Sequence, residues 1–189
     1  MDTLEKAGLL MEGTRADVVN NQVVVITLKD SGTRVTGLKD IGQAESIALA
    51  GGSVPVGKYT RQALVKLGLM PAEDDAAAIA TAQVSEALGG VEISEQDNVS
   101  KVLIAVTEGS CQVGTAYYSD TYGYEDKLDI LEYVSSDLTG DVIYPISLVK
   151  NPEADEAQRT AAKSFCDFVL SDQAKKMFDS YYFETDVRR

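Results

Sequence analysis

Hydrophobic positions along the chain follow two alternating patterns, short continuous runs and longer stretches with helical spacing. Continuous apolar runs at 22–28 (QVVVITL) and 46–50 (SIALA) predict buried strands. Apolar residues with helical spacing follow at 57–67, and Gly68 ends that predicted helix. This alternation of strands and helices predicts an α/β fold whose sheets are substantially parallel.

One stretch, Asp97–Asp120 (DNVSKVLIAVTEGSCQVGTAYYSD), combines a helix, a tight turn and a strand. Asp97 or Asn98 can cap the helix, and the strand predicted at 113–118 ends in two tyrosines. A helix start carries unpaired N–H groups and partial positive charge, which suits an anion, and the strand end can bring a phenol hydroxyl to the same place. The alternative is an ordinary α/β unit with a tyrosine pair at the surface.

A second strand–turn–helix unit spans 46–67, with the sequence GGSVPVGK at its turn. Here the backbone N–H groups of Val56, Gly57 and Lys58 point at whatever lies over the turn, and Gly57 lets a ligand approach the backbone closely. The alternative is a plain connection from a strand to a helix, because such glycine and proline combinations are common in loops.

The remaining patterns predict a helix before Gly13 and two C-terminal helices that begin at Asn151 and Ser171. Pro145 interrupts the apolar run at 142–149 and marks a crossing between lobes. Further elements are predicted by propensity and alternation: a helix at 76–88 and strands at 91–94 and 128–134. The basic residues of the 57–67 helix are expected at the surface: Lys58, Arg61 and Lys66.

The formal net charge of −13 argues against nucleic acid and anionic membrane surfaces as partners. An anion would therefore have to be held by local neutral donors. The chain has no His, which excludes a His-ligated metal and an imidazole base, and two cysteines do not make a zinc site. A disulfide between Cys111 and Cys166 stays open, with Cys166 expected as a buried free thiol.

Catalytic motifs are lacking in the sequence. There is no phosphate-binding loop and no nucleophile elbow, and the acidic groups at 73–75 and 126–129 are expected as solvated faces. We therefore predict a protein that is not an enzyme and needs no cofactor. No apolar run approaches the ~20 residues of a spanning helix, and no signal peptide is present.

The order of these motifs resembles the periplasmic or lipoprotein molybdate-binding proteins of ABC transporters. The resemblance covers nearly the whole chain, and its most specific parts are the turn VPVGKY, the helix start DNV and the strand end GTAYYSD. It implies a two-lobed α/β fold of the type II periplasmic-binding-protein kind that closes on molybdate or tungstate. The implied donors are the backbone N–H groups of Val56 and Val99 and the hydroxyl of Tyr117, while Tyr118 would point to the other face of a regular strand.

The resemblance also implies departures from the family. The two serine hydroxyls that members contribute from the first lobe would precede Met1, so the first lobe is expected to be incomplete and binding to be weakened or absent. The expected domains are a first-lobe helix at 1–21, a second lobe at 22–143 and a return to the first lobe at 144–189, with hinge strands near 26–29 and 143–146. Apolar helix faces left uncovered there would favour self-association, through residues such as Phe165, Phe168 and Phe178.

The expected partners are the oxyanion and a membrane permease, without nucleic acid. The expected location is periplasmic or extracellular, with attachment to the membrane. The main alternative is the effector-sensing domain of a transcription regulator with the same fold, although no DNA-binding helices or basic segment accompany it. A further alternative, an enzyme on this fold, has no supporting motif.

Overall fold

A computed structural model describes residues 1–187 of the chain. The chain divides into two compact units. The central unit is Gln22–Asp141, and the terminal unit joins Met1–Asn21 to the residues from Val142 onward. The chain passes between the units at 21–22 and again at 141–142, two residues before the expected return at 144. The segment expected as a first hinge strand, 26–29, therefore lies within the central unit.

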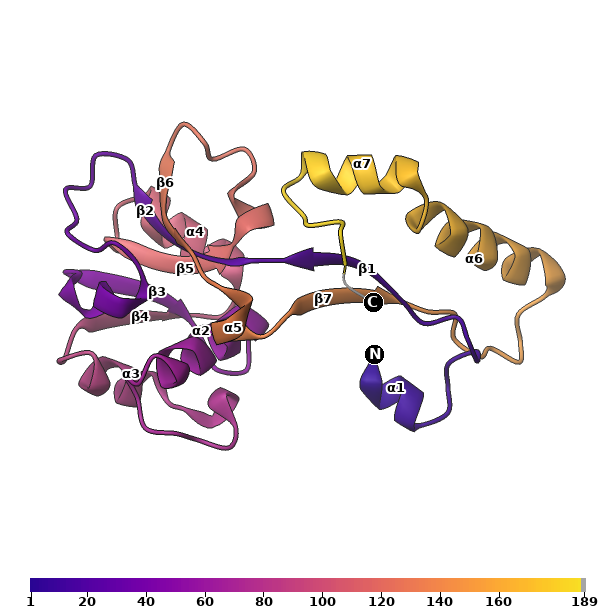
Figure 1. Ribbon diagram of the computed structural model, residues 1–189, viewed down its shortest axis with the longest axis horizontal. Coiled ribbons are helices and arrows are strands. Elements are labelled where there is room, and N and C mark those ends of the chain that lie inside the picture. Colours follow the sequence, from indigo (N-terminus) through magenta and orange to yellow (C-terminus); the bar gives the residue numbers. More distant parts are fainter. Residues whose placement is uncertain (188–189) are drawn as a thin grey trace. The chain divides into compact units, whose positions relative to one another are not determined.

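The central unit is built on a five-stranded mixed sheet (Figure 1). In spatial order its strands are β4 (Glu92–Gln96), β3 (Ser46–Ala50), β5 (Val113–Tyr117), β2 (Val23–Leu28) and β6 (Leu128–Tyr133). Strands β4, β3 and β5 are parallel neighbours, whereas β2 runs antiparallel to both β5 and β6. The α/β prediction is confirmed, but the sheet is mixed because β2 runs against its neighbours.

Helices α2 (Pro55–Lys66) and α4 (Val99–Thr107) follow β3 and β4 and pack on the sheet through buried aliphatic side chains. Gly114 in β5 allows close packing of α4, because a Cβ atom there would lie 2.9 Å from methyl groups of both Val102 and Val106. Shorter helices complete the unit: η1 (Leu38–Gln43), η2 (Ala76–Ala78), α3 (Thr81–Ala87), η3 (Tyr118–Thr121) and α5 (Ser136–Thr139).

The predicted helix at 76–88 is wrong as one element, because the chain leaves the helical conformation at Ile79 (φ −68°, ψ 116°). Ile79 is buried, and its carbonyl accepts a hydrogen bond from Arg61 Nε at 2.9 Å. A side chain from another helix thus takes the acceptor that a continuous helix would have used, so that η2 and α3 are separate.

The terminal unit contains an antiparallel pair, β1 (Ala16–Asn21) with β7 (Val142–Ile146), which the apolar pattern did not predict for β1. The register shifts between Asp17 and Val19, next to the position where Asp17 faces Pro145. A proline has no N–H to donate to a ladder, so an irregularity there is expected. Three helices belong to this unit: α1 (Asp2–Lys6), α6 (Glu156–Val169) and α7 (Asp172–Ser180).

Two helix boundaries in the terminal unit differ from the predictions. Helix α1 ends at Lys6 because Gly8 adopts a left-handed conformation (φ 69°), so Gly13 does not end it. Helix α6 begins after Asp155 rather than at Asn151, since Asp155 and Gln158 form a reciprocal capping box.

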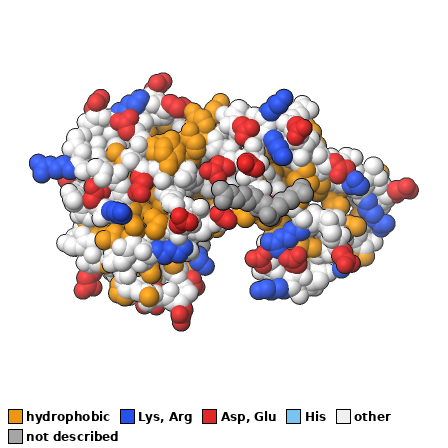
Figure 2. Space-filling model, viewed as in Figure 1, with side chains coloured by type: hydrophobic (Ala, Val, Ile, Leu, Met, Phe, Trp, Pro, Cys, Tyr) orange, Lys and Arg blue, Asp and Glu red, His pale blue; other side chains and the backbone are white. Residues whose placement is uncertain are grey.

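Helix α6 has no buried residue although its sequence is amphipathic. Phe165 is 63% exposed, Phe168 44% and Met177 of α7 52%. Cys166 is half-buried rather than buried, and both it and buried Cys111 are free thiols. Figure 2 shows apolar side chains at the surface among charged ones. We call Phe165, Phe168 and Met177 the exposed apolar face.

Replacing Phe165 with Lys and Phe168 with Glu is expected to reduce self-association of the chain. Exposed aromatic surface drives association, and its loss should shift a concentration-dependent dimer or larger species toward the monomer in sedimentation velocity. The free energy of unfolding should change by less than about 0.5 kcal/mol, because both side chains are exposed. The matched control is Ile104→Lys, an exposed apolar residue of the central unit (48% exposed). A wild-type chain that stays monomeric at high concentration would contradict this prediction.

Candidate functional site

The three predicted ligand-binding residues all lie at one edge of the central sheet. Val56 is in the first turn of α2 after β3, Val99 is the first residue of α4 after β4, and Tyr117 is the last residue of β5. Because β4, β3 and β5 are adjacent and parallel, their carboxyl ends meet at the same edge. Ligands of open α/β sheets bind at such an edge.

The Val56 turn is fixed by its own backbone and by a glycine. Val54 is extended (φ −83°, ψ 131°), and its N–H donates to the Gly51 carbonyl at 2.9 Å. A Cβ atom at Gly57 would lie 2.3 Å from the carbonyl oxygens of both Ala50 and Gly51. The glycine thus allows α2 to start directly against the end of β3, which is a close approach to the protein's own backbone.

The N–H groups in the first turn of α2 have no carbonyl four residues earlier in the helix to accept them. The exception is Lys58, whose N–H donates to the Val54 carbonyl at 3.0 Å. Pro55 has no N–H, so Val56 and Gly57 supply the donors at this helix start. The side chain of Val56 is fully buried, which anchors the residue whose backbone would meet a ligand.

The start of α4 is capped by Asn98, one of the two predicted candidates. Its Oδ1 accepts the N–H of Lys101 at 3.0 Å. The other candidate, Asp97, forms an ion pair with Lys101, and the hydrogen bond and charge of Lys101 lower the pKa of Asp97. This leaves the N–H of Val99 at the first helical position, where the helix itself provides no acceptor.

Hydrogen bonds tie the three positions into one frame. The N–H of Gly51 donates to the Gln96 carbonyl at 2.9 Å and joins the ends of β3 and β4. The buried hydroxyl of Thr60 donates to the Val56 carbonyl at 2.8 Å and lies 3.0 Å from the hydroxyl of Thr115 in β5. The first turn of α2 is therefore linked to β5 two residues before Tyr117.

The two tyrosines at the end of β5 have different surroundings. Tyr117 is buried in the strand, opposite Val23 of β2. Tyr118 lies outside the strand in η3, and its ring packs edge-to-face on Tyr133 with centroids 5.0 Å apart. Of the two, Tyr117 is the residue held by the strand at the candidate site.

Arg61 is fully buried, which corrects the expectation that the basic residues of α2 lie at the surface. Its guanidinium donates to the carbonyls of Ile79, Ala50 and Gly57 at 2.8–2.9 Å and to the Thr81 hydroxyl at 2.8 Å. Burial lowers the pKa of Arg61, and the charge of Glu95 raises it. Sequence spacing could not reveal this role, because two of the partners, Ile79 and Thr81, lie eighteen and twenty residues further along the chain.

Asp120 is a second residue that the sequence analysis did not single out. Its Oδ2 is buried and has no hydrogen-bond partner among the residues that the structure describes. Burial raises the pKa of this carboxyl group against the opposing effect of a hydrogen bond from the Tyr117 backbone. The acidic groups at 73–75 and 126–129 are exposed, as predicted.

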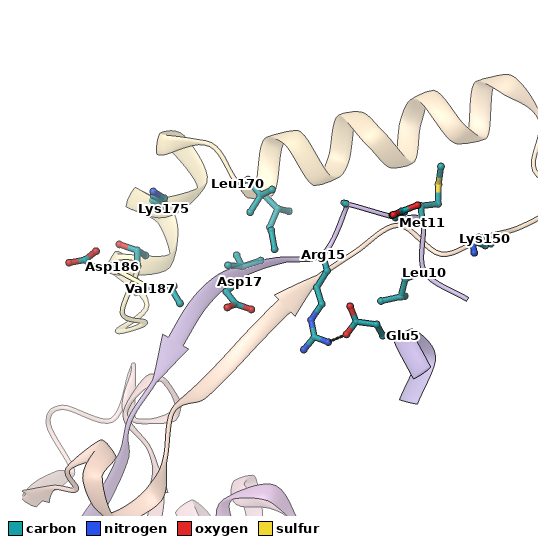
Figure 3. Close-up of a pocket in the computed structure, with 16 residues that line it drawn as sticks. Glu5, Leu10, Met11, Arg15, Asp17, Lys150, Leu170, Lys175, Asp186 and Val187 are labelled. Atoms are coloured by element: carbon teal, nitrogen blue, oxygen red, sulfur yellow. Dashed lines mark hydrogen bonds and ion pairs between the residues drawn. The ribbon is translucent and has the colours of Figure 1, made fainter. Parts of the chain in front are cut away.

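Two of the hollows formed by residues 1–187 lie in the terminal unit, and neither contains a predicted site residue. The larger, about 1050 Å³, is shown in Figure 3 and has both acidic and basic side chains at its wall. Arg15 there is paired with Asp2 and Glu5, and Lys150 Nζ donates to the Gly8 carbonyl at 2.7 Å. The other hollow, about 800 Å³, lies beside α6. Arg15 and Lys150 are thus already engaged within the protein, and the wall also carries the acidic side chains of Glu5, Asp17 and Asp186, so this mixed-charge hollow is a poor site for one small anion.

Other kinds of site find no support in residues 1–187. Within that range no three His, Cys, Asp or Glu side chains are grouped so that they could hold a metal ion. No helix there has both the length and the apolar character that a membrane crossing needs.

Comparison with known proteins identifies relatives of this chain. A lipoprotein of Bacillus subtilis, YvgL, provisionally assigned as the substrate-binding part of an ABC transporter, is 28% identical over 171 residues. That alignment takes in 90% of this chain, and the chain spans 58% of the length of YvgL.

Two solved structures are similar over almost the whole chain. One is from Clostridium difficile, provisionally assigned as the substrate-binding domain of a molybdenum ABC transporter (26% identity, TM-score 0.74, 99% of this chain and 73% of that one). The other is the periplasmic molybdate-binding protein of Azotobacter vinelandii (14% identity, TM-score 0.69, 100% and 74%), a likeness of fold. The profile of the family "Bacterial extracellular solute-binding protein" matches residues 1–184. The chain therefore belongs to the bacterial extracellular solute-binding proteins, a family of binding proteins and not of enzymes.

Proposed function

We propose that the chain captures a tetrahedral oxyanion, molybdate or tungstate, for an ABC importer. The observation that carries this proposal is the meeting of two helix starts and a buried tyrosine at one sheet edge, around Val56, Val99 and Tyr117. The Clostridium difficile structure, whose name refers to molybdenum and which is 26% identical, supports the ligand class. A site of this kind takes no cofactor, since the anion itself is the cargo.

Neutral donors suit such a cargo in a chain with a net charge of −13. Removing a dianion from water is costly unless several donors meet its oxygens. The N–H groups of Val56 and Val99 and the hydroxyl of Tyr117 would donate to different oxygens. Selection against sulfate would follow from the size of the space they enclose, and protonated phosphate would in addition need an acceptor.

The setting of this capture is an extracellular or periplasmic one, where the loaded protein would meet a membrane permease. The extracellular family supports this setting over the alternative of an effector-sensing domain in a transcription regulator. The lipoprotein relative supports attachment to the membrane surface.

A ligand screen tests the proposal. Molybdate and tungstate are expected to raise the melting temperature of the chain, whereas sulfate and phosphate are not. At a ligand concentration a hundred times the Kd, binding adds about 2.7 kcal/mol to the free energy of unfolding. Because weakened binding is expected, the screen should extend to high anion concentrations. In calorimetry, Tyr117→Phe should lower molybdate affinity about tenfold or more, since a hydrogen bond to a charged group is lost.

The matched control for this screen is Tyr122→Phe, which removes a hydroxyl from a tyrosine that is 47% exposed. It should leave molybdate affinity unchanged. Equal shifts with all four anions, or equal effects of the two tyrosine variants, would argue against the proposed site.

A further inference from the structure

The guanidinium of Arg61 is a full positive charge buried directly beneath the candidate site. It contacts the residues that position the Val56 turn, since Nη1 lies 2.8 Å from the Ala50 carbonyl and 2.9 Å from the Gly57 carbonyl. These are the last residue of β3 and the residue after Val56. The side chain thus joins the strand end to the first turn of α2 from inside the unit.

The same group also holds the segment that follows η2. Nε donates to the Ile79 carbonyl at 2.9 Å, and Nη2 donates to the Thr81 hydroxyl at 2.8 Å. Thr81 in turn donates to a carboxylate oxygen of Glu95 in β4. One buried side chain therefore sets the positions of β3, α2 and the start of α3.

The charge of Arg61 is met mainly by neutral oxygens. Among residues 1–187, no carboxylate lies within ion-pair distance of its guanidinium, and Glu95 acts on it from the far side of the Thr81 hydroxyl. A buried charge without an ion pair produces a stronger potential nearby than a surface charge, because the surrounding dielectric is low. This potential has the same sign as that of the helix start above it.

We infer that Arg61 is a positioning residue that also favours divalent over monovalent oxyanions at the Val56–Val99–Tyr117 site. This inference rests on the proposed function and deepens it. Arg61 does not touch the anion; it fixes the turn that donates the Val56 N–H and adds positive potential behind it. In a chain with a net charge of −13, a local positive charge of this kind offsets the general repulsion of a dianion.

The test compares two tetrahedral oxyanions that differ in charge, molybdate (two negative charges) and perrhenate (one). Calorimetry would measure both affinities for wild type, Arg61→Met, Arg61→Gln and Arg61→Lys, with circular dichroism to confirm folding. Arg61→Gln is a second neutral variant, and its amide can still donate to a backbone carbonyl. Arg61→Lys keeps the positive charge but lacks the planar set of donors.

In the neutral variants, molybdate affinity should fall about tenfold more than perrhenate affinity, because a dianion loses twice the electrostatic attraction. In Arg61→Lys both affinities should fall, and their ratio should remain near the wild-type value. Equal losses for the two anions in Arg61→Met and Arg61→Gln would overturn the inference on charge and leave the proposed function standing. A wild-type chain that binds neither anion would overturn the proposed function and this inference with it.

Discussion

Replacing Gly57 with Ala is expected to lower the free energy of unfolding by about 3 kcal/mol, the upper range for an overpacked site. The added methyl group would lie 2.3 Å from the carbonyl oxygens of Ala50 and Gly51, and neither is the end of a flexible side chain. Alanine gains up to about 1 kcal/mol over glycine by helix propensity, which is smaller than the cost of moving two backbone segments. The clash should therefore decide the sign.

Chemical denaturation of the wild type and the variant measures this difference. The control is Lys58→Ala at the next position, an exposed residue whose ion pair with Asp75 should contribute less than about 1 kcal/mol. Molybdate affinity should fall as well, because the start of α2 has to move away from β3. A Gly57→Ala protein as stable as wild type would mean that the two segments are not as close as 2.3 Å implies.

The strands of the central sheet were predictable where the sequence is continuously apolar. The runs that became β2 and β3 are almost wholly apolar, and Val23, Val24, Val25 and Ile26 are all fully buried. Strand β1 was missed, because its two buried valines, Val18 and Val19, stand between polar residues and the strand is completed by pairing with β7. The local pattern of apolar and polar residues indicates which strands are buried, but it is a poor guide to which strands pair through their backbones.

The helix starts of the candidate site were predictable from the sequence, and the residues that support them were not. Helix starts at Val56 and Val99 follow from turn and cap residues that lie next to them in the sequence. The burial of Arg61 depends on acceptors at Ile79 and Thr81, eighteen and twenty residues away, where the predicted helix is broken between η2 and α3. The sequence grouped Arg61 with Lys58 and Lys66 as surface residues of one helix. Of these three, Lys58 and Lys66 are exposed and Arg61 is buried.

The surroundings of Asp120 were also not predictable from the sequence. In sequence it is one of thirty acids, and nothing marks it as buried. In the structure Asp120 lies in η3 directly after Tyr117, where its Oδ2 is buried and has no hydrogen-bond partner among the described residues. Burial disfavours the charged form, so the pKa of Asp120 in the folded chain is raised above its ordinary value of 3.8.

Replacing Asp120 with Asn is expected to stabilise the chain at neutral pH and to leave it unchanged in acid. A carboxyl group whose pKa is raised by folding binds its proton more tightly in the folded state, so the wild type loses stability as pH rises from the unfolded pKa through the folded one. Below that window Asp120 is protonated in both states and resembles Asn. Above it the gain of the variant should be constant and about 1 kcal/mol, the lower range for a buried group left unsatisfied.

Urea denaturation from acid to neutral pH measures this difference at each pH. Acid effects of the other carboxylates occur in both proteins and cancel in the difference, which isolates Asp120. Asp129→Asn, at an exposed position of β6, controls for the removal of one negative charge and should change stability by less than about 0.5 kcal/mol. A gain for Asp120→Asn that is the same at every pH would show that packing rather than charge is responsible. A loss at neutral pH would mean that the ionised carboxylate is stabilised in the folded chain, by a contact that outweighs its burial.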